Sequence, residues 1–256
     1  MSQPRAVERL TPRFDAPPAT RLGMISLASD EVAPDELRAV ICQPGFVLHE
    51  SRIANSDTID ETTLRAMAAG LTEAAARLPG GAPYAAVAYL CTSASMLIGF
   101  EGVANRINTA LPGAMVTNPM LAGIRACKRL GATRIALVTP YITEVTVGIA
   151  NRFESSGISV SRMASFLTDS DARVARISEN SLSDAAAEMS GGGGVDAVFL
   201  SCTALRTVHC IAEIEERVGC PVLGSNQVTA WDLLRMAGVG PTPGRWGRLF
   251  MATEKK

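Results

Sequence analysis

Two cysteines stand in nearly the same local sequence, and this repetition constrains the fold more than any other feature of the chain: AVAYLCTSAS surrounds Cys91 and AVFLSCTALR surrounds Cys202. In each, an apolar run typical of a buried strand stops at Cys-Thr and gives way to small residues, which predicts a thiol at the carboxyl end of a parallel strand. The two cysteines are 111 residues apart (202 minus 91). Two other fragment pairs recur at almost the same offset, TRLGMIS at Thr20 with TRIALVT at Thr133, and GFVLH at Gly45 with GISVS at Gly157. These offsets indicate an internal duplication.

The duplication predicts two α/β lobes within the 256 residues. A chain of this length allows one or two domains of roughly 100–200 residues, and a repeat of about 112 residues favours two. Apolar residues make up 47% of the chain but aromatic residues only 5%, so Ala, Val, Ile and Leu are expected to fill the core, as in helices packed on parallel sheets. We expect a poorly ordered lead-in at 1–19, a first lobe at 20–117 joined by a C-terminal helix at 226–240, a second lobe at 118–225 and a tail at 241–256.

Strand and helix patterns alternate along both halves. The expected strands are 22–27, 46–49, 84–90, 114–117, 135–139, 159–163, 197–200 and 221–223. The expected helices are 35–41, 59–78, 99–111, 119–130, 145–156, 177–189, 205–218 and a last one at 231–237. This alternation predicts parallel sheets with right-handed crossovers, which bind ligands beyond the carboxyl ends of their strands. Both Cys-Thr turns fall at such ends, so if the duplicated lobes face each other, one cleft is expected to receive a thiol from each side.

Two opposed thiols permit stereochemistry that needs no cofactor. One thiolate can remove a proton from a carbon, or add to a double bond, while the other thiol donates a proton on the opposite face. The start of the helix expected after each cysteine would favour thiolate, and its N–H groups, together with Thr92, Ser93 and Thr203, would bind a carboxylate. We expect the sulfurs to lie roughly 7–10 Å apart, with a substrate carbon between them. A lone cysteine at a strand end is more often a small core residue, but the repetition favours function here.

Other classes of function lack the residues they need. A net charge of −1 gives no electrostatic case for nucleic acid or an anionic membrane, which leaves a small molecule as the expected ligand. The first twenty residues contain no apolar signal segment, so a cytoplasmic location with reduced thiols is expected. No dinucleotide or phosphate-binding motif occurs, neither histidine adjoins a nucleophile elbow, and no cysteines have zinc spacing. Lysine occurs only at Lys128, Lys255 and Lys256, which offers no convincing Schiff base.

The remaining four cysteines are interpreted as structural: Cys42, Cys127, Cys210 and Cys220. What remains is thiol chemistry without cofactor or metal.

At this point the sequence resembles a known family. The motifs RLGMISLASD, AYLCTSAS, ALVTPYITE, FLTDSDARVARIS, FLSCTALR and SNQVTAW, between about Arg21 and Ala237, are similar to those of the aspartate/glutamate racemase superfamily. Within it, the chain resembles the maleate cis-trans isomerase and arylmalonate decarboxylase branch, and most nearly the racemase-like proteins of bacterial ectoine-utilisation operons. The resemblance implies two pseudo-symmetric flavodoxin-like lobes with the active site between them, and a homodimer or higher homo-oligomer.

The resemblance also implies roles for individual residues. Cys91 and Cys202 match the two catalytic cysteines, Tyr141 matches a tyrosine that binds the substrate carboxylate, and Asp171 falls near an asparagine with a similar part. Asp30 stands where maleate isomerases carry asparagine, and we expect it to favour a substrate with an amine over maleate, or else to cap the helix that follows. Further substrate contacts are expected at Thr92, Ser93, Thr203, Ala204 and Asn226, the last of which is as well explained by a helix cap.

The sequence thus predicts a cofactor-independent isomerase or racemase of a small carboxylate or amino acid. The alternatives are a maleate cis-trans isomerase proper and a cofactor-free decarboxylase of a malonate-like diacid. Decarboxylases of this branch keep one catalytic cysteine, so the presence of both disfavours that reading. The non-enzyme alternative is a ligand-binding protein with an inactive cleft.

Overall fold

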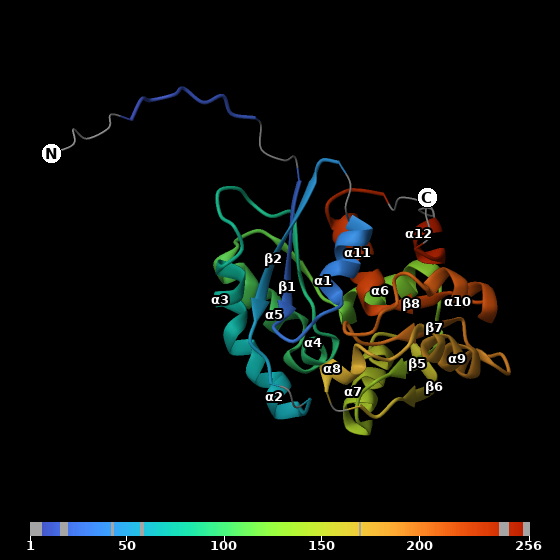
Figure 1. The fold of residues 1–256 in the computed structure, drawn as a ribbon. Coiled ribbons are helices and arrows are strands. Elements are labelled where there is room, and N and C mark those ends of the chain that lie inside the picture. The colour runs from blue at the N-terminus through green and yellow to red at the C-terminus, as the bar shows by residue number, and fades with distance from the viewer. Residues whose placement is uncertain are drawn as a thin grey trace.

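The computed structural model describes residues 7–15, 20–41, 44–56, 59–168, 170–240 and 246–252. The expected lead-in and tail lie partly outside these ranges, at 1–6, 16–19, 241–245 and 253–256, as does Cys42. Residues 7–15 run as an extended segment away from the two lobes (Figure 1). Beyond it, the chain builds two sheets with helices packed around them (Figure 1).

Each lobe contains a four-stranded parallel sheet, and the two sheets have the same strand order, β2-β1-β3-β4 and β6-β5-β7-β8. The predicted α/β fold of two similar parallel-sheet lobes is therefore confirmed. β3 and β7, which lead to the two cysteines, are 111 residues apart at their starts (197 minus 86). The strands are β1 (Thr20–Leu27), β2 (Phe46–Ile53), β3 (Ala86–Tyr89), β4 (Met115–Thr117), β5 (Arg134–Thr139), β6 (Ser159–Ser165), β7 (Ala197–Leu200) and β8 (Val222–Gly224).

The helices occupy the crossovers between strands. They are α1 (Ala33–Ile41), α2 (Glu61–Ala66), the 3₁₀ turn η1 (Met67–Gly70), α3 (Leu71–Ala76), α4 (Thr92–Ile98), α5 (Phe100–Ala110), α6 (Pro119–Leu130), α7 (Thr143–Glu154), α8 (Asp171–Val174), α9 (Glu179–Ser190), α10 (Ile211–Val218), α11 (Ser225–Met236) and α12 (Arg248–Met251). α11 returns from the end of the chain to pack against α1 and α6 (Figure 1). α11 thus packs against one helix from each half of the chain.

Several elements differ from the sequence expectation, among them α4 and α8, which were not expected as separate helices. The helix expected at 59–78 is broken into α2, η1 and α3, with Gly70 at the last junction. β2 continues to Ile53 instead of ending at 49, because it pairs with β1 along its whole length as an edge strand, where polar side chains are tolerated. α11 begins at Ser225, six residues before the helix expected at 231–237 but only one before the C-terminal helix expected at 226–240, and α12 follows it.

The second lobe packs α6 against β7 through a glycine, and this contact gives a stability prediction. A Cβ on Gly123 would lie 2.7 Å from the ring of Phe199, which is fully buried and packs edge to face on Phe153 with ring centroids 5.0 Å apart. Gly123→Ala should therefore destabilise the protein by about 1–3 kcal/mol, because the ring must move within a close-packed core. Chemical unfolding measures this, with Gly80→Ala, which meets nothing within 4 Å, as the control. A Gly123→Ala protein as stable as wild type would contradict the tight packing.

Candidate active site

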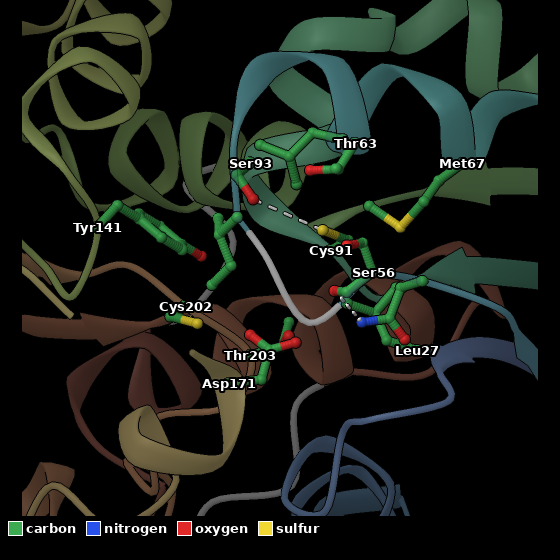
Figure 2. A pocket seen from close by; sticks show the side chains of 13 residues that line it. Leu27, Ser56, Thr63, Met67, Cys91, Ser93, Tyr141, Asp171, Cys202 and Thr203 are labelled. Atoms are coloured by element: carbon green, nitrogen blue, oxygen red, sulfur yellow. Dashed lines mark hydrogen bonds between the residues drawn. The ribbon is translucent and has the colours of Figure 1, made fainter. Parts of the chain in front are cut away.

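A pocket between the lobes contains both cysteines of the repeated sequence. It encloses about 370 Å³ including its open mouth, and side chains from both lobes line it (Figure 2). The described residues that line it are Leu27, Asn55, Ser56, Ile59, Thr63, Leu64, Met67, Cys91, Ser93, Tyr141, Asp171, Cys202 and Thr203. Six of the ten predicted site residues are therefore brought together in one place.

Cys91 lies directly at the start of a helix. It is the N-cap of α4, and its Sγ accepts a hydrogen bond from the backbone N–H of Ala94 at 3.4 Å. The hydroxyl of Ser93 lies 3.6 Å from the same sulfur (Figure 2). Because the first N–H groups of a helix have no partner within the helix, this position stabilises negative charge on Cys91.

Cys202 does not have an equivalent helix, so the expectation of a helix start beside each thiol is wrong for the second one. The segment after Cys202 forms turns, and α10 begins at Ile211 rather than at 205. The 203–210 segment is tied to distant residues, because the Val208 N–H donates to Glu36 and the carbonyl of Thr203 accepts from Asn226. Instead, the Tyr141 hydroxyl points toward the sulfur of Cys202 (Figure 2), and this side chain opposes the rise in the pKa of Cys202.

Both thiols are held in the neutral form by their surroundings. Burial raises the pKa of Cys91 to about 11, against the hydrogen bonds from Ala94 and Ser93. Burial, followed by the negative charge of Asp171, raises the pKa of Cys202 further. The pKa of Tyr141 is also raised well above its ordinary value, first by burial, so its hydroxyl remains a hydrogen-bond donor. Cys91 is therefore the more easily ionised of the two thiols.

This difference predicts the pH dependence of alkylation. A group whose pKa is near 11 gains about tenfold in thiolate per pH unit between pH 7 and 10, so the rate at which iodoacetamide modifies Cys91 should rise by about tenfold per unit without levelling off. Cys202 should react more slowly at each pH. Mass spectrometry of the two peptides measures both rates, and the denatured chain, whose thiols level off near their ordinary pKa, is the control. A plateau for Cys91 at neutral pH would contradict the raised pKa.

Asp171 brings a carboxylate to the same pocket. It opens α8, and its Oδ2 accepts a hydrogen bond of 2.7 Å from the Ser29 hydroxyl, which in turn accepts one of 2.8 Å from the Asn55 amide. The charge of Asp171 raises the pKa of both pocket thiols. Among the described residues that line the pocket there is no lysine, arginine or histidine. The pocket thus offers hydrogen-bond donors and one carboxylate, without a cationic side chain to balance a dicarboxylate.

Four of the predicted contacts do not line the pocket in the structure. Asp30 caps α1, with its Oδ1 accepting from the backbone N–H groups of Val32 and Ala33 at 2.8 Å each, which is the alternative considered for it. Its carboxylate is buried, burial raises its pKa, and its charge still raises the pKa of both pocket thiols. The other three are Thr92, Ala204 and Asn226.

These three residues make contacts with other residues of the protein instead of lining the pocket. The Thr92 hydroxyl lies 3.0 Å from that of Ser225 at the start of α11. The backbone of Ala204 bonds Cys202 and opposes the rise in its pKa. Asn226 is fully buried in the first turn of α11 and donates 2.8 Å hydrogen bonds to Glu36 and to the carbonyl of Thr203, so it is neither a helix cap nor part of the pocket lining.

The sequence did not predict the rim of the pocket between β2 and α2. Asn55, Ser56, Thr63 and Met67 line it from the segment after β2 and from the broken helix. The rule that placed the cysteines, ligand sites beyond the carboxyl ends of parallel strands, applies to β2 as well. It missed this rim because the strand was expected to end at 49, four residues short of Ile53.

Two other types of site are absent from the described ranges. No group of three or more His, Cys, Asp or Glu side chains there could hold a metal ion. No described helix is both long enough and apolar enough to cross a membrane.

Both the sequence and the fold of the chain are similar to those of known proteins. A family model described as arylmalonate decarboxylase matches residues 51–250. The arylmalonate decarboxylase of Bordetella bronchiseptica is 34% identical over 151 residues, which cover 58% of this chain and 61% of that protein. The maleate isomerase of Alcaligenes faecalis is 25% identical over 234 residues, covering 86% of this chain and 91% of that protein.

Among solved structures, the maleate isomerase Iso from Pseudomonas putida S16 superposes with a TM-score of 0.81 at 22% identity, covering 90% of this chain and 98% of that one. At this identity the similarity concerns the fold. The whole of the two-lobed architecture is therefore shared with that protein.

Proposed function

Because the chain belongs to the arylmalonate decarboxylase family, we propose that it is an isomerase or racemase of a small carboxylate that uses Cys91 and Cys202 and no cofactor. The observation that carries this proposal is that two thiols from two duplicated strand ends line one pocket. Chemistry on both faces of one carbon needs such a pair. The sulfurs are expected roughly 7–10 Å apart in this mechanism.

In the proposed reaction Cys91 acts first. The pKa of Cys91 is raised less than that of Cys202, and the start of α4 and the Ser93 hydroxyl stabilise its negative charge. Cys91 therefore becomes the thiolate. It takes the proton bonded to the substrate carbon, and the electron pair of that bond moves onto the carboxylate as an enolate. The Cys202 thiol then gives its proton to the opposite face of the carbon, which inverts it and leaves Cys202 as the thiolate. On an alkene, the same pair adds as thiolate and proton donor to neighbouring carbons, the new single bond rotates, and elimination reverses the addition.

We propose that hydrogen-bond donors of the pocket bind the substrate carboxylate and that a pocket carboxylate binds a second, cationic group of the substrate. Ser93, Tyr141 and Thr203 are polar side chains of the pocket that can donate hydrogen bonds to a substrate carboxylate. Asp171 lines the same space, and its charge contributes to the raised pKa of the buried Asp30 carboxyl. A substrate with one carboxylate and an amine therefore complements the pocket better than maleate, whose second carboxylate would meet Asp171. The selective role expected of Asp30 is accordingly assigned chiefly to Asp171.

A second candidate function is cofactor-free decarboxylation of a malonate-like diacid. The observation that favours it is the 34% identity to the decarboxylase of Bordetella bronchiseptica. One proton donor on one face is sufficient for that reaction, so the second thiol would have no part in it. A further alternative is a ligand-binding protein whose pocket does not catalyse turnover.

One experiment separates these functions. The protein is incubated in D₂O with amino acids, maleate and substituted malonates, and proton NMR with chiral analysis follows each compound. Racemisation exchanges the α-proton for deuterium and inverts the carbon, isomerisation converts maleate to fumarate, and decarboxylation shortens the diacid. Our proposal expects inversion with deuterium incorporation. Loss of carbon dioxide from malonates alone would establish the decarboxylase, and saturable binding without any conversion would establish the binding protein.

A further inference from the structure

Glu36, on α1, joins the first lobe to the segment that follows Cys202. Its Oε1 accepts the backbone N–H of Val208 at 2.9 Å, and its Oε2 accepts the Asn226 amide at 2.8 Å. The same Asn226 nitrogen donates to the carbonyl of Thr203 at 2.8 Å. One carboxylate therefore ties together both ends of the 203–208 segment, whose first residue directly follows the second thiol and lines the pocket.

The two cysteines differ in the local structure that follows them, and this difference suggests a role for the contacts of Glu36. After Cys91 the backbone enters α4 at once, and the helix fixes the turn that carries the thiol. After Cys202 the next helix begins only at Ile211, so the turn has no such support from its own chain. We propose that Glu36 is a positioning residue that takes the place of this missing helix and holds the Cys202 turn in its working geometry. The proposal goes beyond the proposed function, although its kinetic test depends on that function.

No cationic side chain is among the described groups that shift the pKa of Glu36. The side chain is buried, and the groups that favour its charge are the Asn226 amide and the backbone N–H groups of Val208 and Thr207. The titratable groups that face it are Asp30, whose charge opposes ionisation of Glu36, and Cys210, whose pKa is raised in part by Glu36. Burial raises the pKa of Glu36 to about 7. Both protonation states are therefore populated near neutral pH.

Protonation of Glu36 would loosen the segment for a geometric reason. Both carboxylate oxygens accept from N–H donors, so a proton on either one sets a donor against a donor. Asn226 can relieve this, since its Oδ1 is buried and has no hydrogen-bond partner in the described part of the chain. Rotation of its amide would bring Oδ1 to the new O–H, but would take the amide nitrogen away from the carbonyl of Thr203. The segment would lose its hold at the end next to Cys202.

The test compares Glu36→Gln with a matched substitution elsewhere. Glu215→Gln is the control, because Glu215 is also buried and its carboxylate also accepts two backbone N–H groups, from Val222 at 2.9 Å and Arg248 at 2.7 Å, outside the pocket. Amide hydrogen exchange, corrected for the intrinsic rate at each pH, is measured by mass spectrometry on the segments 203–210 and 92–98. This readout does not require activity.

We expect Glu36→Gln to speed exchange in 203–210 by at least about tenfold at pH 8 and to leave 92–98 unchanged. In wild type, protection of 203–210 should rise between pH 6 and pH 8 as Glu36 ionises, and in Glu36→Gln this dependence should be absent. With a substrate found by the NMR screen, kcat should fall by about tenfold or more while KM changes by less than about threefold, because the Cys202 turn is displaced whereas three of the four proposed binding groups, Ser93, Tyr141 and Asp171, lie outside the 203–210 segment.

Three outcomes would decide against the proposal: exchange in 203–210 that matches wild type, a pH dependence that persists in Glu36→Gln, or the same effects in Glu215→Gln. Where no substrate is found but the exchange results hold, the proposed function fails and the positioning role stands.

Discussion

Replacing either Cys91 or Cys202 by alanine should abolish inversion or cis-trans conversion and leave the fold intact. Each thiol serves one face of the substrate, so neither can replace the other, and loss of one acid or base is expected to reduce kcat by about 10³-fold or more. Both side chains are small and lie at strand ends, so their removal should not disturb the sheets. Circular dichroism and the unfolding temperature check the fold, and chiral analysis checks the rate. Cys220→Ala, outside the pocket, is the matched control.

The two variants should differ in the half-reaction that they retain. Cys202→Ala keeps the proposed base and should exchange the α-proton of one enantiomer for deuterium without inverting it. Cys91→Ala should do the same, more slowly, for the opposite enantiomer, because the pKa of Cys202 is raised further than that of Cys91. Near-normal turnover in either variant would refute the two-thiol mechanism, and inversion that survives in Cys91→Ala alone would favour a single-cysteine decarboxylase-like site.

The sequence predicted those parts of the fold that have a strong local hydrophobic pattern and occur twice in the chain. Apolar runs ending at Cys-Thr predicted β3 and β7, and their common offset predicted two sheets of one strand order, which is what the chain forms. The shared pocket followed from the rule on strand ends together with the expectation that the duplicated lobes face each other, which the resemblance to the family also implied. Each strand was predicted from its local pattern, and the pairing of the lobes from the repeat.

What the sequence could not predict depends on contacts between distant segments. β2 runs on through a polar stretch because β1 pairs with it, and the pocket rim at Asn55 and Ser56 follows from that pairing. The segment before the late start of α10 is hydrogen-bonded to two residues far away in sequence. Its Val208 N–H donates to Glu36, and its Thr203 carbonyl accepts from Asn226. Asp30 and Asp171 cannot be told apart by their local sequence. Only the tertiary structure shows that Asp30 caps a helix and that Asp171 lines the pocket.

The charge of Asp171 should decide which substrates the pocket accepts. None of the described residues that line the pocket is a lysine, arginine or histidine, so a second carboxylate on the substrate would lie close to the like charge of Asp171, and such pairs cost about 1.4 kcal/mol or more, or about tenfold in affinity. Asp171→Asn removes that charge, while its side-chain oxygen can still accept from Ser29. We expect maleate to bind about tenfold more tightly to this variant, measured by calorimetry, and the native reaction of an amine-bearing substrate to slow by about tenfold or more.

A comparison with Asp30 tests whether contact or distant charge is responsible. Asp30→Asn retains an oxygen that can cap α1, so it should not unfold the protein, and it removes an equal charge from behind the pocket. Because Asp30 does not line the pocket, its substitution should also improve maleate binding and impair the native reaction, but less than Asp171→Asn does. Equal effects would mean that the general field of the site selects the substrate. If the wild-type protein converts maleate to fumarate efficiently, neither carboxylate excludes a diacid, and the preference for an amine is wrong.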